Sequence, residues 1–297
     1  MSPSRVLRMG SPRVLALTLA AALAVAAAGC GNDGATEPGE RAAPGPPKGS
    51  GGLEHIHGLG VRGTTLYIAT HAGLWAAPGG QTKSTPVGTS GQDVMGFSVL
   101  GPKRFIGSGH PAPGQDLPPS LGLIESRDGG KSWKSISLPG EADFHVLESL
   151  GQRVYGFDGS QGRLMVSSDG GRSFQQRTSP AAMFSLAIDP GDPDRVVSAT
   201  ERGIFASSNG GRGWKPLRDD IAGLLAWPEA DRLYLVDGSG QLQVSRDAGR
   251  RWTSSGEVGG EPAAFLAEGK QLYAALADAT VKRSGDGGRS WSVRALP

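Results

Sequence analysis

Cysteine is almost missing from this chain of 297 residues, in which Cys30 is the only one. A single thiol excludes an internal disulfide and any metal or redox centre that needs two cysteines. Neither sign of charge dominates, because 30 basic residues stand against 28 acidic ones and the net charge is +2. We therefore expect no nucleic-acid partner. A glycine-rich phosphate loop that opens a helix is also missing from the sequence.

The first thirty residues have the composition of a targeting segment. Arg5, Arg8 and Arg13 form a basic start, and Val14 to Ala28 are almost all apolar. The apolar run is too short to span a membrane and ends in small residues, which is typical of a secretory signal with a cleavage site. We therefore predict a signal peptide over residues 1–29.

The end of this segment, "AAAGC", resembles a bacterial lipobox. The resemblance implies that Cys30 carries a lipid and anchors the protein to the cell membrane on its extracytoplasmic face. The alternative is a plain signal peptide that happens to contain a cysteine. Residues 30–52 hold hardly any large apolar side chain and are rich in Gly and Pro, which predicts a flexible tether. The folded domain is predicted to be residues 53–297.

A repeated octapeptide sets the organisation of residues 53–297. Five copies begin at the following positions: "SRDGGKSW" at Ser126, "SSDGGRSF" at Ser167, "SSNGGRGW" at Ser207, "SRDAGRRW" at Ser245 and "SGDGGRSW" at Ser284. A fixed spacing of about 40 residues is typical of a propeller or a solenoid. Ser and Asp side chains bond local amides and Gly takes positive φ, so each copy predicts a hairpin turn. A sixth, degenerate copy lies at Ala77-Pro78-Gly79-Gly80.

The octapeptide resembles the Asp box, or BNR repeat, of the sialidase-like and Vps10-like propellers. Each repeat also contains four short strand patterns, as in "GLLAW", "RLYLVD", "QLQVS" and "RWTSS" of the fifth. We therefore predict an all-β fold, a six-bladed β-propeller of four-stranded antiparallel blades with Asp-box turns. No strand pattern is left over to join the last blade to the first, so we expect closure by packing. We expect a monomer.

The five histidines all fall in the first three repeats. When the first strands are aligned, His57 matches Met95, His145 and Met183, and His55, two residues earlier, matches Asp93 and Asp143. Side chains two apart share one strand face, so these positions form two layers at one end of the channel. The ends of the second strands add three more residues to the same end: His71, His110 and Asp158. The Asp-box turns are expected at the opposite end.

Two interpretations of this channel end stay open. In the first, the histidines bond ordered water and stiffen the mouth. In the second, they bind a metal or another ligand, and the candidate residues are His55, His57, His71, Met95, His110, His145 and Met183, with Asp93, Asp143 and Asp158 orienting them. Thioether sulfur favours copper over zinc. A proline-rich insertion over residues 107–122 is predicted to cover part of the same mouth.

The resemblance to sialidases implies a second function, glycoside hydrolysis of the exo-α-sialidase type. An Arg-Ile-Pro motif and arginines in the aligned first strands are missing. The four tyrosines recur at one second-strand position, which indicates packing rather than a unique nucleophile. Asp93 and Asp143 are the carboxylates we would assign if the chain were a hydrolase. We favour a protein without enzyme activity, and leave open a glycoside hydrolase of the exo-α-sialidase type that lacks the usual arginine triad.

A third function follows from "AIDPGDPDRVVSATERGIFASSNGGRGW" in the fourth repeat. This stretch resembles Vps10/sortilin-type and photosystem-assembly-type propellers, which bind proteins or peptides without catalysis. Our first hypothesis is a membrane-tethered propeller that binds a ligand at the histidine-bearing mouth, with copper as the leading candidate. The alternatives are a sialidase-like hydrolase, whose partner is a glycan, and a propeller that binds a peptide or protein.

Overall fold

The computed structural model describes residue 53 and residues 55–297. The predicted signal peptide, Cys30 and the tether lie outside these described residues, as does Glu54. The described part contains 24 strands and no helix. Within it the structure therefore offers no helix of the length and apolarity needed to span a membrane.

The strands form six sheets of four, and each sheet uses four consecutive strands in antiparallel order. Blade 1 consists of β1 (Ile56–Arg62), β2 (Thr65–Thr70), β3 (Gly73–Ala77) and β4 (Thr85–Pro86). Blade 2 consists of β5 (Asp93–Val99), β6 (Phe105–His110), β7 (Leu123–Ser126) and β8 (Lys134–Ser137). Blade 3 consists of β9 (Phe144–Leu150), β10 (Arg153–Asp158), β11 (Arg163–Ser167) and β12 (Gln175–Arg177).

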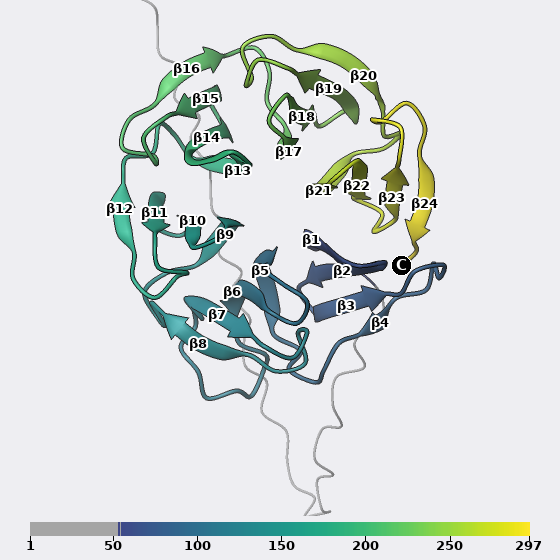
Figure 1. Cartoon of the computed structure of the whole chain (residues 1–297). Helices are drawn as coiled ribbons and strands as arrows, with labels where there is room; N and C mark the ends of the chain where they lie inside the picture. The colour runs from purple at the N-terminus through teal and green to yellow at the C-terminus, as the bar shows by residue number, and fades with distance from the viewer. Residues whose placement is uncertain (1–52, 54) are drawn as a thin grey trace, which may run out of the picture. The chain divides into compact units, whose positions relative to one another are not determined.

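The second half of the domain repeats this order. Blade 4 consists of β13 (Met183–Asp189), β14 (Asp192–Thr200), β15 (Gly203–Ser207) and β16 (Lys215–Arg218). Blade 5 consists of β17 (Leu224–Glu229), β18 (Arg232–Val236), β19 (Gln241–Ser245) and β20 (Thr253–Glu257). Blade 6 consists of β21 (Pro262–Glu268), β22 (Gln271–Leu276), β23 (Val281–Ser284) and β24 (Ser292–Ala295). Figure 1 shows the blades arranged in a ring, with the first strand of each facing the centre, so the six-bladed propeller is confirmed.

The octapeptides form the turns between the third and fourth strands, as predicted. In blade 2, Ser126 Oγ donates to Asp128 Oδ1 at 2.8 Å and accepts the amide of Gly130 at 2.7 Å. The Gly129 amide donates to the carbonyl of Lys103, in the turn between β5 and β6. The octapeptide turns therefore lie at the end of the ring where first strands finish, opposite the end where they begin.

Most of the hydrophobic core lies between neighbouring blades. Tyr155 and Phe157 on β10 pack with Leu186 and Ile188 on β13, so blades 3 and 4 share one cluster. All four tyrosines belong to such clusters or pack against them. Burial raises the pKa of Tyr155 to about 12, and its hydroxyl donates to the carbonyl of Pro193 at 2.7 Å. The tyrosines thus occupy packing positions, as the repeat predicted.

The ring closes between blades 6 and 1, which share no strand in the described part of the chain. Leu59 and Ile68 of blade 1 and Tyr273 of blade 6 belong to one buried cluster. In addition, Leu296 pairs with Lys83 in an isolated parallel bridge. The guanidinium of Arg294 in blade 6 also donates hydrogen bonds to backbone carbonyls of blade 1. We call this contact the Arg294 latch, and the sequence did not predict it.

Candidate functional site

The first strands share an irregularity near their beginning. The pairing of β1, β5, β9, β13 and β21 with the second strands shifts by one residue there. A bulge of this kind leaves one residue outside the ladder and re-aims its side chain. The bulged residues are His57, Met95, His145, Phe184 and Ala263. All five line one cavity of about 670 Å³, bounded by the first strands of the six blades.

The structure corrects the predicted register in blade 4 by one residue. Met183 was aligned with His57, but Phe184 occupies the bulge and lines the cavity. Met183 is 5% exposed and packs with Tyr155 in the core between blades 3 and 4. Of the two methionines predicted at this end of the cavity, Met95 therefore lies there and Met183 does not. The case for copper, which depended on two thioether ligands, is weaker.

Two groups of histidine and aspartate side chains meet at this end of the cavity. The first histidine cluster consists of His57, His71 and Asp93, and the second consists of His110, Asp143 and His145. Within each cluster one donor atom from every residue lies within 4.8 Å of the others. We call this end of the cavity, with the two clusters and the bulged residues, the histidine mouth.

In the first histidine cluster an aspartate of blade 2 meets two histidines of blade 1. His71 Nδ1 lies 2.8 Å from Asp93 Oδ2, and His57 Nε2 lies 3.9 Å from Asp93 Oδ1. The rings of His57 and His71 are 4.3 Å apart, edge to face. Burial, and then the neighbouring His71, lower the pKa of His57 to about 4. His57 is therefore neutral at physiological pH.

The second histidine cluster lies one blade further on. Asp143 is buried and accepts from His145 Nε2 at 2.8 Å, while His110 Nε2 lies 3.4 Å from the same oxygen. The hydrogen bond with Asp143 raises the pKa of His145 above its usual range. Burial acts to raise the pKa of Asp143, but the hydrogen bond and charge of His145 outweigh it and leave this pKa lowered. An anionic Asp143 thus faces two imidazoles.

Besides Met95 and Met183, two predicted site residues lie outside both clusters. His55 precedes β1 with φ of +50°, is exposed, and its ring lies 5.1 Å from that of His71. Asp158 is fully buried and accepts from Ser160 and Arg163, so it holds the turn after β10. No hydrogen bond joins Asp158 to an imidazole in the described part of the chain.

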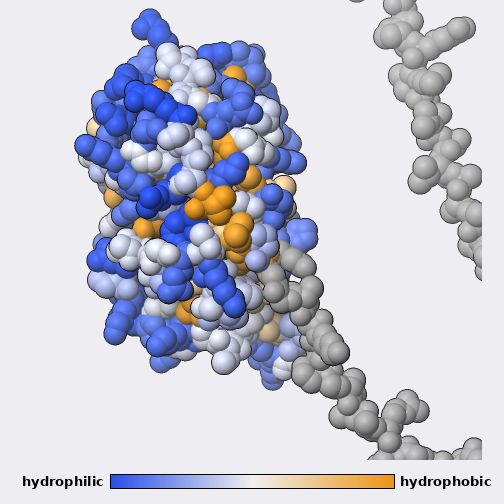
Figure 2. Space-filling view, turned by 90° about the vertical axis from the view of Figure 1, so that its right-hand side faces the viewer, coloured by the Kyte–Doolittle hydropathy of each residue, from blue (hydrophilic) through white to orange (hydrophobic). Residues whose placement is uncertain are grey.

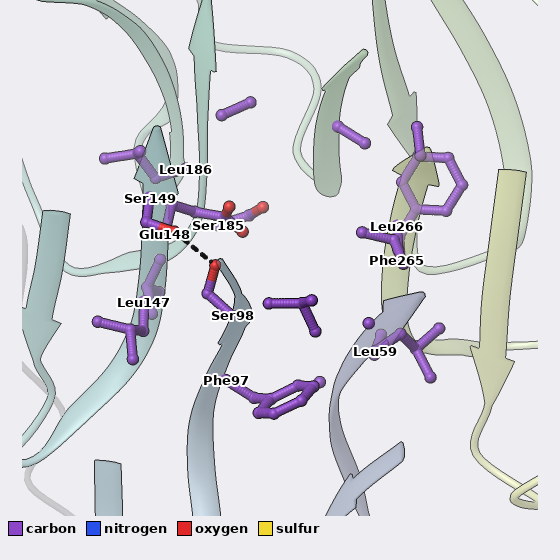
Figure 3. Close-up of a pocket in the computed structure, with 18 of the residues that line it drawn as sticks. Leu59, Phe97, Ser98, Leu147, Glu148, Ser149, Ser185, Leu186, Phe265 and Leu266 are labelled. Atoms are coloured by element: carbon purple, nitrogen blue, oxygen red, sulfur yellow. Dashed lines mark hydrogen bonds between the residues drawn. The ribbon is translucent and has the colours of Figure 1, made fainter. Parts of the chain in front are cut away.

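Glu148 is a cavity residue that belongs to none of the predicted sites. It lies on β9 three residues after His145, lines the cavity, and is shown beside Ser98 and Ser149 in Figure 3. The hydroxyls of Ser98 and Ser149 bond to each other across blades 2 and 3 at 2.7 Å. Burial raises the pKa of Glu148 to about 8. The signal available in the sequence was the one carboxylate in this strand, with apolar residues on both sides of it in the sequence.

The raised pKa of Glu148 makes stability depend on pH. Between the ordinary value of 4.5 and about 8 the folded state keeps a proton that the unfolded state releases, so stability falls as pH rises through this window. We expect Glu148→Gln to remove this loss. Allowing for screening by solvent in the cavity, the variant should be more stable than wild type by about 1–2 kcal/mol at about pH 8 and equal to it at about pH 4. Thermal melts of both proteins across this pH range test the prediction. An equal difference in stability between variant and wild type at both pH values would contradict it.

These observations define the class of the protein as a six-bladed β-propeller with a histidine-bearing channel mouth. No family model matches the chain. A curated relative, the photosystem II assembly lipoprotein Ycf48 of Synechococcus sp. (strain CC9902), is 25% identical over 183 residues, covering 57% of this chain and 48% of that protein. The match therefore spans about half the length of the curated relative.

Two solved structures show the same fold. A chain from a nidogen/laminin complex is 16% identical with a TM-score of 0.62, covering 79% of this chain and 94% of that one. An ancestral GH74 enzyme is 13% identical with a TM-score of 0.53, covering 84% of this chain and 39% of that one. At these identities the likeness establishes the propeller alone.

Proposed function

We propose that the chain is a non-catalytic binding propeller that holds a protein segment at the histidine mouth. The observation that carries the proposal is the exposure of Phe184, which stands 43% exposed on the bulge of β13. Large apolar side chains are normally withdrawn from water, and aromatic residues are enriched where proteins bind one another. The other first-strand bulges carry His57, Met95, His145 and the small Ala263.

A second exposed apolar residue lies at the same end of the propeller. Leu117 is 52% exposed in the loop that joins β6 to β7. His110 at the end of β6 anchors this loop, because its Nδ1 lies 2.8 Å from the carbonyl oxygen of Pro119. Phe184 and Leu117 thus offer apolar contacts from two blades around a polar mouth, which suits an extended segment with mixed side chains.

The similarity to an assembly lipoprotein supports the same proposal. That relative is named for photosystem II assembly. For the present chain we propose a role in holding a partner protein rather than in converting a substrate. The relative is also named a lipoprotein, which supports the proposal that Cys30 anchors this chain to a membrane.

Glycoside hydrolysis remains the alternative and gains little from the structure. Asp93 and Asp143 are both engaged by imidazoles, and all four tyrosines are packed in or against the core.

Replacing Phe184 by aspartate is expected to weaken partner binding about 30-fold, since losing a central aromatic contact costs about 2 kcal/mol or more. The control is Val293→Asp, because Val293 is similarly exposed, at 46%, but lies on the outer strand β24. Figure 2 looks onto the side of the ring that carries β24, where apolar residues gather within a largely hydrophilic surface.

The measurement is quantitative co-purification from detergent-solubilised membranes of the source cells, with and without chelator. Proteins recovered with the wild-type chain should be lost with Phe184→Asp and retained with Val293→Asp and with chelator. Equal recovery with Phe184→Asp, or loss confined to Val293→Asp, would remove the mouth as the binding site.

A further inference from the structure

The two histidine clusters share a His–Asp pair that recurs after one step of the propeller repeat. In each, a histidine at the end of a second strand meets an aspartate at the start of the next blade, and these pairs are His71 with Asp93 and His110 with Asp143. A bulged histidine completes each cluster. In the first it is His57 of the same blade, and in the second it is His145 of the next blade. The His–Asp pair therefore occurs twice, at adjacent blade interfaces, and the third histidine comes from a different side of the interface each time.

Buried polar atoms in both clusters lack a hydrogen-bond partner. They are His57 Nε2, Asp93 Oδ1 and Asp143 Oδ1. Asp143 is only 4% exposed, so leaving one of its oxygens unpaired is costly. The two orphan atoms of the first cluster, on His57 and Asp93, face each other at 3.9 Å. A cation between them would satisfy a nitrogen lone pair and a carboxylate oxygen together.

Second contacts hold the ligand atoms of the second cluster in place. The Pro119 carbonyl can only accept, so His110 Nδ1 donates to it, and in the neutral ring the lone pair of Nε2 is directed at Asp143. A lone pair that faces a carboxylate at 3.4 Å is repelled unless a proton or a metal ion lies nearby. A backbone carbonyl on the far nitrogen of a ligand histidine is a recurring feature of metal sites.

A glycine makes room for the third ligand of that cluster. A Cβ on Gly159 would lie 2.8 Å from Nδ1 of His145. Gly159 is also tied to the cluster through its backbone, because its amide donates to the carbonyl of Asp143 at 3.0 Å. The His145 ring therefore packs directly on backbone, which fixes its position.

From this geometry we propose that the histidine mouth binds two divalent transition-metal ions, one in each histidine cluster. Each ion takes two imidazole nitrogens and one carboxylate oxygen and keeps at least one position open, and in the second cluster the proton that His145 Nε2 donates to Asp143 is released to solvent when the ion binds. Imidazole with carboxylate suits zinc(II) or copper(II), whereas copper(I) prefers the thioether ligands that Met183 does not supply here. The metal site does not depend on the proposed protein partner, since every ligand belongs to this chain.

The test uses the full chain purified from membranes without a polyhistidine tag. The protein is stripped with chelator, dialysed against zinc sulfate or copper(II) sulfate, and analysed for bound metal by mass spectrometry. We expect two ions per wild-type chain, one for His71→Ala, one for His110→Ala, and none for the double variant. His71 and His110 side chains are 46% and 42% exposed, so their removal leaves the core intact.

The matched control is His55→Asn, at a histidine of the same mouth that belongs to neither cluster. Asparagine tolerates the positive φ of this position, and the variant should keep two ions. Electron paramagnetic resonance of the copper(II) form should show nitrogen coupling, and the total signal should fall by about half in each single variant. One ion or none on the wild-type chain, or undiminished binding by a folded double variant, would overturn the proposal. Because this readout needs no partner, its failure is separate from failure of the proposed function.

Discussion

Replacing Arg294 by alanine is expected to lower the melting temperature of the propeller by about 6–12 °C, which corresponds to about 3 kcal/mol. Blades 6 and 1 share no strand in the described residues, so the ring closes through side chains and one isolated bridge. The Arg294 guanidinium donates to four backbone carbonyls of blade 1, which are those of Thr64, Ala77, Pro78 and Gln81. Loss of the latch leaves these acceptors without their donor.

A control in the same blade separates the latch from a general effect of charge. Arg289 is exposed, and in the described part of the chain it forms no ion pair, so Arg289→Ala should change the melting temperature by no more than about 2 °C. Thermal unfolding followed by circular dichroism measures both variants. Equal melting temperatures for Arg294→Ala and Arg289→Ala would mean that the buried cluster closes the ring without the latch.

Replacing Phe144 by alanine is expected to cost about 3–5 kcal/mol, the other large effect. Phe144 is fully buried at the start of β9 and packs with Ile106 of blade 2. Its ring lies against Gly156, where an added Cβ would come within 2.5 Å of it. The neighbouring backbone closes over the ring, so alanine would leave a cavity that the site cannot easily refill.

The comparison variant is Phe184→Ala in the neighbouring blade. Phe144 precedes the bulge of β9 and points into the core, whereas Phe184 lies on the bulge of β13 and is 43% exposed. Phe184→Ala should therefore change stability by less than about 0.5 kcal/mol. Urea unfolding of both variants tests the corrected register. A large loss of stability for Phe184→Ala would mean that Phe184 is buried and Met183 lines the cavity, as the sequence alignment predicted.

The sequence predicted the fold because its repeated signal is local. The turn at Ser126, Asp128 and Gly130 is built from hydrogen bonds between residues two to four positions apart, so the residue types reveal it directly. The spacing of such turns then sets the number of blades and the order of strands. The end of the channel that carries the histidines follows from the same alternation of strand direction.

Features that depend on contacts between blades were not predictable in this way. A bulge adds one residue to a strand, and two adjacent apolar residues such as Met183 and Phe184 give no pattern that reveals which of them it displaces. The latch joins Arg294 to carbonyls more than 200 residues earlier, and backbone carbonyls leave no mark in a sequence.

The sequence predicted where four of the histidines lie, but not how they group or which other residues join them. Alignment of the repeats brought His57, His71, His110 and His145 to one end of the channel, where the structure places them. Their division into two clusters depends on which blade supplies each aspartate. Asp93 of blade 2 contacts a histidine of blade 1, and Asp143 of blade 3 contacts one histidine of blade 2 and one of its own blade. Asp158 was expected to orient an imidazole, but a buried carboxylate beside Arg163 holds its own turn instead.

Photo-crosslinking from the two ends of the propeller tests most directly whether the histidine mouth is the binding end. A photoreactive amino acid is introduced at Leu117, beside the mouth, or at Lys131, in the turn between β7 and β8 at the opposite end. Both positions are exposed, so neither substitution disturbs the core. In membranes of the source cells we expect one discrete crosslinked product from position 117, absent in the Phe184→Asp background, and none from position 131. A product from position 131 alone, or a product from position 117 that persists with Phe184→Asp, would contradict the assignment of the mouth.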